Sequence, residues 1–140
     1  MKKITPKNIQ RDWQLVDAKN QILGRISTQI ARHLMGKNKS YYVSYIDTGD
    51  YVVVINAKDI MLSGKKEKQK RYYHHSGYPG GMYVKTAAQI KETKPELLLK
   101  HAVKGMLPKT VMGRNMLKKL YVFPETEHPY KNNFRKESNA

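Results

Sequence analysis

The chain has 140 residues, which fits one domain with a hydrophobic core of its own, and it contains no cysteine. The absence of cysteine excludes disulfides, thiolate metal sites and a cysteine nucleophile. With 27 Lys and Arg against 11 Asp and Glu, the formal net charge is +16, which predicts a polyanionic partner. Nucleic acid is the first candidate partner, an anionic membrane surface is the second, and a basic protein without such a partner is the third interpretation.

The first third of the chain predicts a strand and an amphipathic helix. A short strand is expected at residues 13–16. Apolar side chains then recur at steps of three and four from Leu23 to Leu34, which is the spacing of a helix with one apolar face. Gly36 suits the end of this helix. Arg25 and Arg32 fall on its opposite face, so we expect the helix to pack on one side and to present positive charge on the other.

The middle of the chain predicts a buried strand and a basic loop. Residues 51–55 form a continuous, mainly β-branched run without alternation, which is typical of a strand covered on both faces. Residues 64–71 are expected to form a loop that carries four lysines and one arginine against a single glutamate. A further strand is expected at residues 71–74, followed by a glycine-rich loop at residues 77–81.

Two short signals place helices in the next part of the chain. Thr86 and Gln89 have the spacing of a capping box, which predicts the start of a short helix. Pro95 is expected in the first turn of the following helix, where its missing N–H costs little. Pro108 closes that helix, whose apolar stripe is expected to pack inward.

The end of the chain completes the predicted architecture. Residues 111–120 predict a last helix and residues 121–123 an edge strand. The order of strand, helix, strand, small elements and helices predicts one α/β domain with helices on both faces of a small sheet. We divide this single domain into a basic N-terminal arm (1–11), an α/β core (12–127) and a polar C-terminal tail (128–140).

No segment predicts a membrane span or a secretory signal. The longest uninterrupted apolar stretch, Tyr51 to Ile55, is far shorter than the roughly 20 residues of a membrane helix. The basic start of the chain resembles that of a signal peptide, but no apolar run follows it between Ile4 and Arg11. We therefore expect a soluble protein that stays in the cytoplasm, where it is made.

Three segments favour contact with RNA. The basic loop at 64–71 predicts phosphate contacts, which supply affinity rather than sequence choice; a solvated hairpin tip is the alternative. Residues 72–78 mix aromatic rings with His and Ser, which suits stacking on unpaired bases. Of Tyr72 and Tyr73, we expect one to be core and the other to face outward. The lysines and arginine of residues 103–114 gather at a helix corner, although a plain corner with solvated lysines is the alternative.

An enzyme or a metal site is the weaker interpretation. Asp47 and Asp50 are close in sequence, but Asp-Thr-Gly-Asp is common turn chemistry before a strand. His74 and His75 are adjacent in a predicted strand, so their rings point to opposite faces and do not converge on one ion. The glycine loop at 77–81 lacks the Gly-Lys-Ser/Thr ending of a nucleotide-binding loop. We therefore expect no catalytic residue and no metal ligand.

Five sequence blocks, taken together and in this order, resemble the ribosomal protein L13 family in its bacterial form. They span residues 13–128, which is nearly the whole chain. The blocks are Leu23-Gly24-Arg25, Asp47-Thr48-Gly49-Asp50-Tyr51, Tyr72-Tyr73-His74-His75-Ser76-Gly77 with Gly80-Gly81, Ala102-Val103-Lys104-Gly105-Met106-Leu107-Pro108, and Gly113-Arg114 followed by Met116, Leu117 and Leu120.

The resemblance implies a three-layer α/β/α domain with a small, mainly parallel central sheet of about four strands. It also implies a structural constituent of the large ribosomal subunit that binds large-subunit ribosomal RNA and supports early subunit assembly and translation. Neighbouring large-subunit proteins are the other expected partners of what would be a monomer in the ribosome. The resemblance implies no cofactor, no catalysis, no small-molecule substrate and no membrane partner.

Two other functions remain open at this stage. A free regulatory RNA-binding module, for example one that represses its own message, would use the same basic surfaces. An enzyme would use Asp47, Asp50 and the His pair. Under the ribosomal hypothesis, the expected RNA contacts are Arg11, Arg25, Arg32, Lys37, Lys39, Lys65, Lys66, Lys68, Lys70, Arg71, His74, His75, Gly77, Tyr78, Gly80, Gly81, Lys104, Lys109, Arg114, Lys118 and Lys119.

Overall fold

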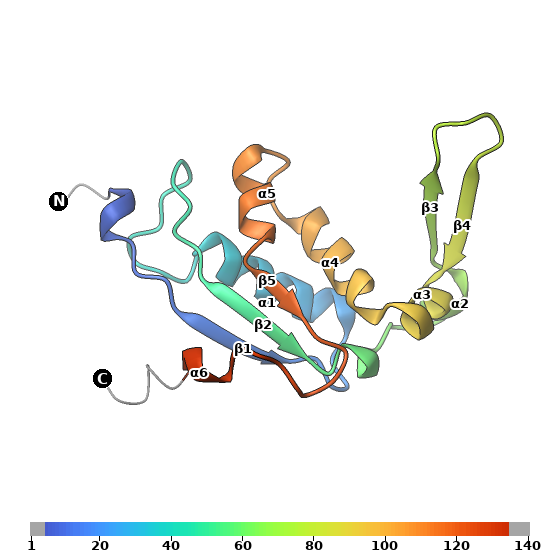
Figure 1. Ribbon diagram of the computed structural model, residues 1–140, viewed down its shortest axis with the longest axis horizontal. Coiled ribbons are helices and arrows are strands. Elements are labelled where there is room, and N and C mark those ends of the chain that lie inside the picture. The colour runs from blue at the N-terminus through green and yellow to red at the C-terminus, as the bar shows by residue number, and fades with distance from the viewer. Residues whose placement is uncertain (1–4, 135–140) are drawn as a thin grey trace.

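The computed structural model describes residues 5–134 and shows a central sheet, a layer of helices and a projecting hairpin (Figure 1). Within these residues, no helix is both long enough and apolar enough to cross a membrane. In chain order, the elements are η1 (Pro6–Asn8), β1 (Trp13–Asp17), α1 (Leu23–Met35), β2 (Tyr51–Ile55), η2 (Ala57–Asp59), α2 (Lys66–Gln69), β3 (Arg71–His75), β4 (Met82–Thr86), α3 (Ala87–Thr93), α4 (Pro95–Met106), α5 (Val111–Leu117), β5 (Leu120–Val122) and α6 (Lys131–Phe134).

The central sheet has three parallel strands in the order β1-β2-β5. Trp13 lies opposite Tyr51, and Val52 lies opposite Leu120. The remaining two strands, β3 and β4, form a separate antiparallel hairpin. The predicted fold class, a single α/β domain with a small and mainly parallel sheet, is therefore confirmed, with three strands in the sheet where about four were expected.

One face of the sheet carries the hydrophobic core. Side chains alternate along a strand, so Val52 and Val54 point to the same face as Leu120 and Val122, where α1 and α4 pack. The predicted stripe of α1 is fully buried there. Gly36 ends α1 in a left-handed conformation at φ 78°, as a C-terminal glycine does, and its N–H bonds to the carbonyl of Arg32.

Aromatic rings cover the opposite face of the sheet. Trp13 stacks on Tyr51 with ring centroids 4.6 Å apart, and Tyr121 lies beside Trp13 at 5.9 Å. The C-terminal segment adds Tyr130, at 5.2 Å from Trp13, and Phe134, which meets Trp13 edge-to-face at 6.2 Å. Part of the predicted polar tail therefore folds as α6 and forms the thin third layer, because rings at positions 130 and 134 lie one helical turn apart.

The predictions of individual helices and strands are partly confirmed and partly wrong. The Thr86–Gln89 capping box is confirmed, and Pro95 occupies the first turn of α4 as predicted. The predicted basic loop contains one helical turn, α2, and β4 was not anticipated. The helix expected at 111–120 ends at Leu117, and Leu120 opens β5 instead. Pairing of this segment with β2 outweighs the helical spacing of its apolar residues, because tertiary contacts override local propensity.

The starts of the parallel strands meet the end of α1 in a tightly packed junction. The Asp50 N–H donates to the carbonyl of His33 at 3.0 Å, and the Asp50 carboxylate accepts the Asp12 N–H at 3.1 Å. Gly49 lies so close to α1 that an added Cβ would overlap the carbonyl oxygen of Leu34. Glycine at position 49 therefore allows the chain to return from α1 into β2.

Gly49→Ala should lower the free energy of unfolding by about 2 kcal/mol or more, because the methyl group would force the backbone of α1 and the loop apart. Urea unfolding of the two proteins measures this difference. Gly24→Ala is the matched control, since an added Cβ there meets nothing within 4 Å. That helical replacement should leave stability unchanged or raise it by up to about 1 kcal/mol. Equal effects of both substitutions would contradict the prediction.

Candidate nucleic-acid interface

The β3–β4 hairpin stands away from the sheet and its helices (Figure 1). Its register pairs Tyr73 with Val84 and His74 with Tyr83. Nearly every side chain of both strands is exposed, and the hairpin is fixed at its base by α2 and α3. There the Ala87 N–H donates to the carbonyl of Lys70 at 2.9 Å. The hairpin therefore offers both of its faces to a partner.

A groove separates the hairpin from α4, and we call it the hairpin cleft. Its volume is about 610 Å³. Tyr72 anchors the hairpin beside α4, with its ring edge-on to His101 at 5.2 Å and the ammonium of Lys70 5.4 Å from its centroid. The residues that line the cleft are Lys70, Arg71, Tyr72, Tyr73, Ile90, Leu97, Leu98, Lys100, His101, Lys104 and Leu117. The cleft thus combines a cationic rim with an apolar and aromatic interior.

The corner between α4 and α5 extends the same basic surface. A smaller pocket of about 180 Å³ lies there, and it shares Lys104 and Leu117 with the hairpin cleft. Lys109 and Arg114 stand on its rim. Thr110 caps α5 by accepting the Gly113 N–H at 3.4 Å, and this capping fixes the helix start from which Arg114 projects. Four cations therefore lie at this corner: Lys104 on α4, Lys109 between the helices, Arg114 on α5 and Lys118 just after it.

Most of the expected contact residues lie in two neighbouring groups. The hairpin and α2 carry Lys65, Lys66, Lys68, Lys70, Arg71, His74, His75, Gly77, Tyr78, Gly80 and Gly81, while the α4–α5 corner carries Lys104, Lys109, Arg114 and Lys118. Arg25, Arg32 and Lys37 are exposed along α1 and just after it. Arg11 lies apart from the hairpin and donates to the carbonyl of Asp47 at 3.4 Å. Of the tyrosine pair, Tyr73 faces outward, as expected of one of the two, but Tyr72 is half-buried beside α4 and is not part of the hydrophobic core.

Two of the expected contacts are internal, and we withdraw them from the interface. Lys119 is only 7% exposed, and its ammonium donates to the Asp47 carboxylate at 2.7 Å and to the carbonyl of Gly49 at 3.0 Å. Burial lowers the pKa of Lys119, and the neighbouring Asp47 carboxylate partly opposes that shift. Lys39 pairs with Asp50 and donates to the carbonyl of Gln10 at 2.6 Å. Neither ammonium is free to bind phosphate.

The sequence interpretation missed several cleft residues. No sequence motif singled out His101. Lys85, which lines an adjoining cavity, comes from the unanticipated strand β4. Lys100 lies on α4 and forms an ion pair with Glu96 at 3.6 Å. The aromatic and β-branched residues Tyr83, Val84 and Thr86 are the local signal that could have indicated β4. The approach of the hairpin to α4 has no local signal.

The residues of the enzyme hypothesis do not converge. Asp47 and Asp50 lie at the strand starts, bonded to Lys119 and Lys39, whereas the His pair lies on the hairpin at the other end of the molecule (Figure 1). The His75 Nδ1 accepts the N–H of Gly77 at 2.9 Å and shapes the hairpin tip. Within residues 5–134, no group of three or more His, Cys, Asp or Glu side chains is arranged to hold a metal ion.

This combination of a small α/β scaffold and a cationic cleft defines a class of basic proteins suited to a polyanionic partner. The family model described as "Ribosomal protein L13" matches residues 11–129. The chain is 51% identical over 131 residues to the large ribosomal subunit protein uL13 of Dictyoglomus thermophilum, covering 94% of this chain and 92% of that one. The chain therefore belongs to the ribosomal protein L13 family.

Other bacterial members of the family are similarly close. The uL13 protein of Thermotoga petrophila is 53% identical over 127 residues, which is 91% of this chain and 85% of that one. The uL13 protein of Nitrosococcus oceani is 52% identical over 125 residues, or 89% and 88% of the two chains. The expected family is confirmed. As a ribosomal protein of this family, the chain is not an enzyme, and its location in bacteria is the ribosome of the cytoplasm.

Lys119→Met should lower the free energy of unfolding by about 3 kcal/mol, because Asp47 would keep a largely buried charge without its partner. Thermal or urea unfolding measures the loss. Lys118→Met is the matched control, since it removes the same charge one position earlier on an exposed side chain. The control should change stability by less than about 0.5 kcal/mol. A stability loss of similar size in both variants would argue against the junction role of Lys119.

Proposed function

We propose that this protein is a structural constituent of the large ribosomal subunit that binds large-subunit ribosomal RNA and supports early subunit assembly and translation. The observation that carries the proposal is the cationic surface that runs from α2 through the hairpin cleft to the α4–α5 corner. Phosphate groups contribute most of the affinity in complexes of this kind, and Lys and Arg are the side chains that neutralise them.

Most cations of this surface are not neutralised within the protein. Lys70, Arg71, Lys104, Lys109 and Arg114 form no ion pair with any residue in the described part of the chain, residues 5–134. Like charges gathered on one side repel each other in the free protein. A polyanion removes that repulsion and releases its own counterions, so the arrangement favours a nucleic-acid partner.

The same proposal covers the wider organisation of the protein. The relatives bear the name of a large-subunit protein, and neighbouring proteins of that subunit are the expected protein partners of a monomer. We propose that residues 12–127 act as one core domain and that residues 1–11 form an arm on the partner. Residues 1–4 of that arm and residues 135–140 of the C-terminal tail lie outside the described residues.

Binding of the purified protein to large-subunit ribosomal RNA, against an equal mass of unrelated structured RNA, tests the proposal directly. A preference for the ribosomal RNA that persists as salt rises supports a specific partner. Equal affinity for both RNAs that disappears together with salt would indicate only polycation behaviour, and would contradict the proposal.

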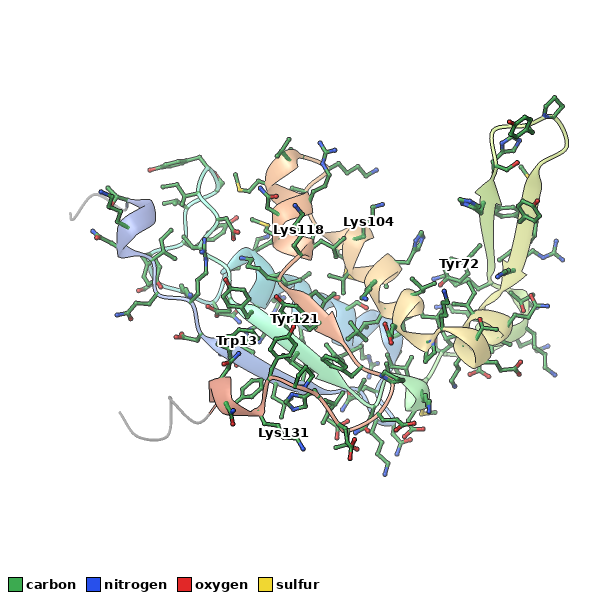
Figure 2. The ribbon with its side chains drawn as sticks, viewed as in Figure 1. Trp13, Tyr72, Lys104, Lys118, Tyr121 and Lys131 are labelled. Atoms are coloured by element: carbon green, nitrogen blue, oxygen red, sulfur yellow. The ribbon has the colours of Figure 1, made fainter. Side chains whose placement is uncertain are left out.

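Arg114→Ala should weaken binding to large-subunit ribosomal RNA and reduce the slope of log K against log salt by about one, because one phosphate contact is lost. Filter binding or anisotropy at four or five salt concentrations measures the slope. Lys131→Ala is the control, since Lys131 is an exposed cation on the opposite side of the sheet from Lys104 and Lys118 (Figure 2). Its slope should match that of the unmodified protein. An unchanged slope for Arg114→Ala would remove Arg114 from the interface.

A further inference from the structure

We propose that the hairpin cleft holds unpaired nucleotides of an RNA, with their bases against its aromatic and apolar interior and their phosphates on its lysine rim. This inference rests on the proposed function and specifies which part of an RNA the protein recognises there. It distinguishes the cleft from the rest of the basic surface, where phosphate contact alone is expected.

The interior of the cleft is shaped for flat apolar groups. A second cavity of about 440 Å³ adjoins the main groove, and the two share Tyr72, Tyr73, Ile90 and Leu97. Tyr83 pairs with His74 and therefore lies on the same face of the hairpin as Tyr72, whereas Tyr73 points to the opposite face. Leu97 is 50% exposed, although it is a large apolar side chain. Tyr83 adds a further ring to the second cavity and is 60% exposed. Exposed rings beside an apolar floor form a stacking surface for bases.

The hairpin itself indicates that this surface has a partner. A two-stranded hairpin is marginally stable in water on its own, and here neither of its faces is covered by a third strand. Tyr72 anchors one strand through its edge contact with His101, while the outward Tyr73 contributes little to that anchoring. The exposed apolar side chains on the hairpin are therefore better explained by a bound partner than by the fold of the free chain.

The charges around the cleft select among partners. The rim carries Lys70, Lys85, Lys94, Lys100 and Lys104, and of these only Lys100 forms an ion pair within the described residues. An apolar protein segment in the cleft would leave these ammonium groups partly desolvated and unpaired. A continuous RNA duplex would reach the rim with its phosphates, but its stacked bases would leave the interior empty. Unpaired nucleotides match both the rim and the interior.

The experiment compares two single-stranded probes of about ten nucleotides, an adenine RNA and an abasic strand with the same number of phosphates. The unmodified protein should bind the adenine RNA roughly tenfold more tightly than the abasic strand, because base stacking adds to phosphate contact. Tyr83→Ala should remove most of this difference, and Tyr83→Phe should retain it. Tyr73→Ala, on the opposite face of the hairpin, is the control and should also retain it. The emission of Trp13, which lies in the aromatic cluster on the sheet, reports whether each variant is folded.

Salt dependence separates this inference from the proposed function. Tyr83→Ala should weaken binding of the adenine RNA without changing the salt slope, whereas Lys104→Ala should reduce the slope by about one. Equal affinity for the adenine and abasic probes, or full binding by folded Tyr83→Ala, would overturn the base-holding role. If Arg114→Ala still weakened binding of large-subunit ribosomal RNA in that case, the proposed function would stand without the base-holding role of the cleft. The inference would also be overturned if the cleft variants lost only a contact with another protein of the large subunit and still bound RNA fully.

Discussion

The ammonium group of Lys119 links the starts of the parallel strands, and the packing of the whole domain depends on this junction. This ammonium group binds the Asp47 carboxylate and the Gly49 carbonyl just before β2. The backbone carbonyl of Lys119 accepts the N–H of Val52 at 3.1 Å. Asp50 joins β1 through Asp12 and joins α1 through His33. One short segment thereby sets the relative positions of three strands and the helix that covers them.

The central sheet fixes the position of the candidate nucleic-acid interface, although its strands supply none of the residues that line the hairpin cleft or the α4–α5 pocket. The core face holds α1 and α4 together, so the exposed side of α4 stays at a defined place while α5 turns back toward β5. The hairpin projects beyond α4 at the end of the molecule away from the junction (Figure 1). The aromatic layer under the sheet keeps α6 on the side opposite the cleft (Figure 2). The exposed cations of α4 and of the α4–α5 corner are thereby held at fixed positions beside the hairpin cleft.

The limits of prediction follow from the range of the interactions. Helical spacing, the glycine stop at Gly36 and the Thr86 capping box are local, so α1 and α3 were predictable. Lys118 and Lys119 are the same residue type in adjacent positions, yet one is exposed and the other binds Asp47, 72 positions away in the chain. The local sequence around Lys118 and Lys119 does not indicate which of the two has a partner so far away in the chain. The unanticipated strand β4 and the groove beside α4 arise in the same way.

The two kinds of lysine explain how one basic chain serves both stability and binding. A buried ammonium must find a carboxylate, because desolvation of an unpaired charge costs several kcal/mol, and Lys39 and Lys119 each have one. An exposed ammonium loses little without a partner and remains free for phosphate. Acidic residues are scarce, and those at the junction are used in its ion pairs. The cations around the cleft are consequently left largely without internal carboxylates, so the surplus charge is concentrated where the aromatic rings of the hairpin are also exposed.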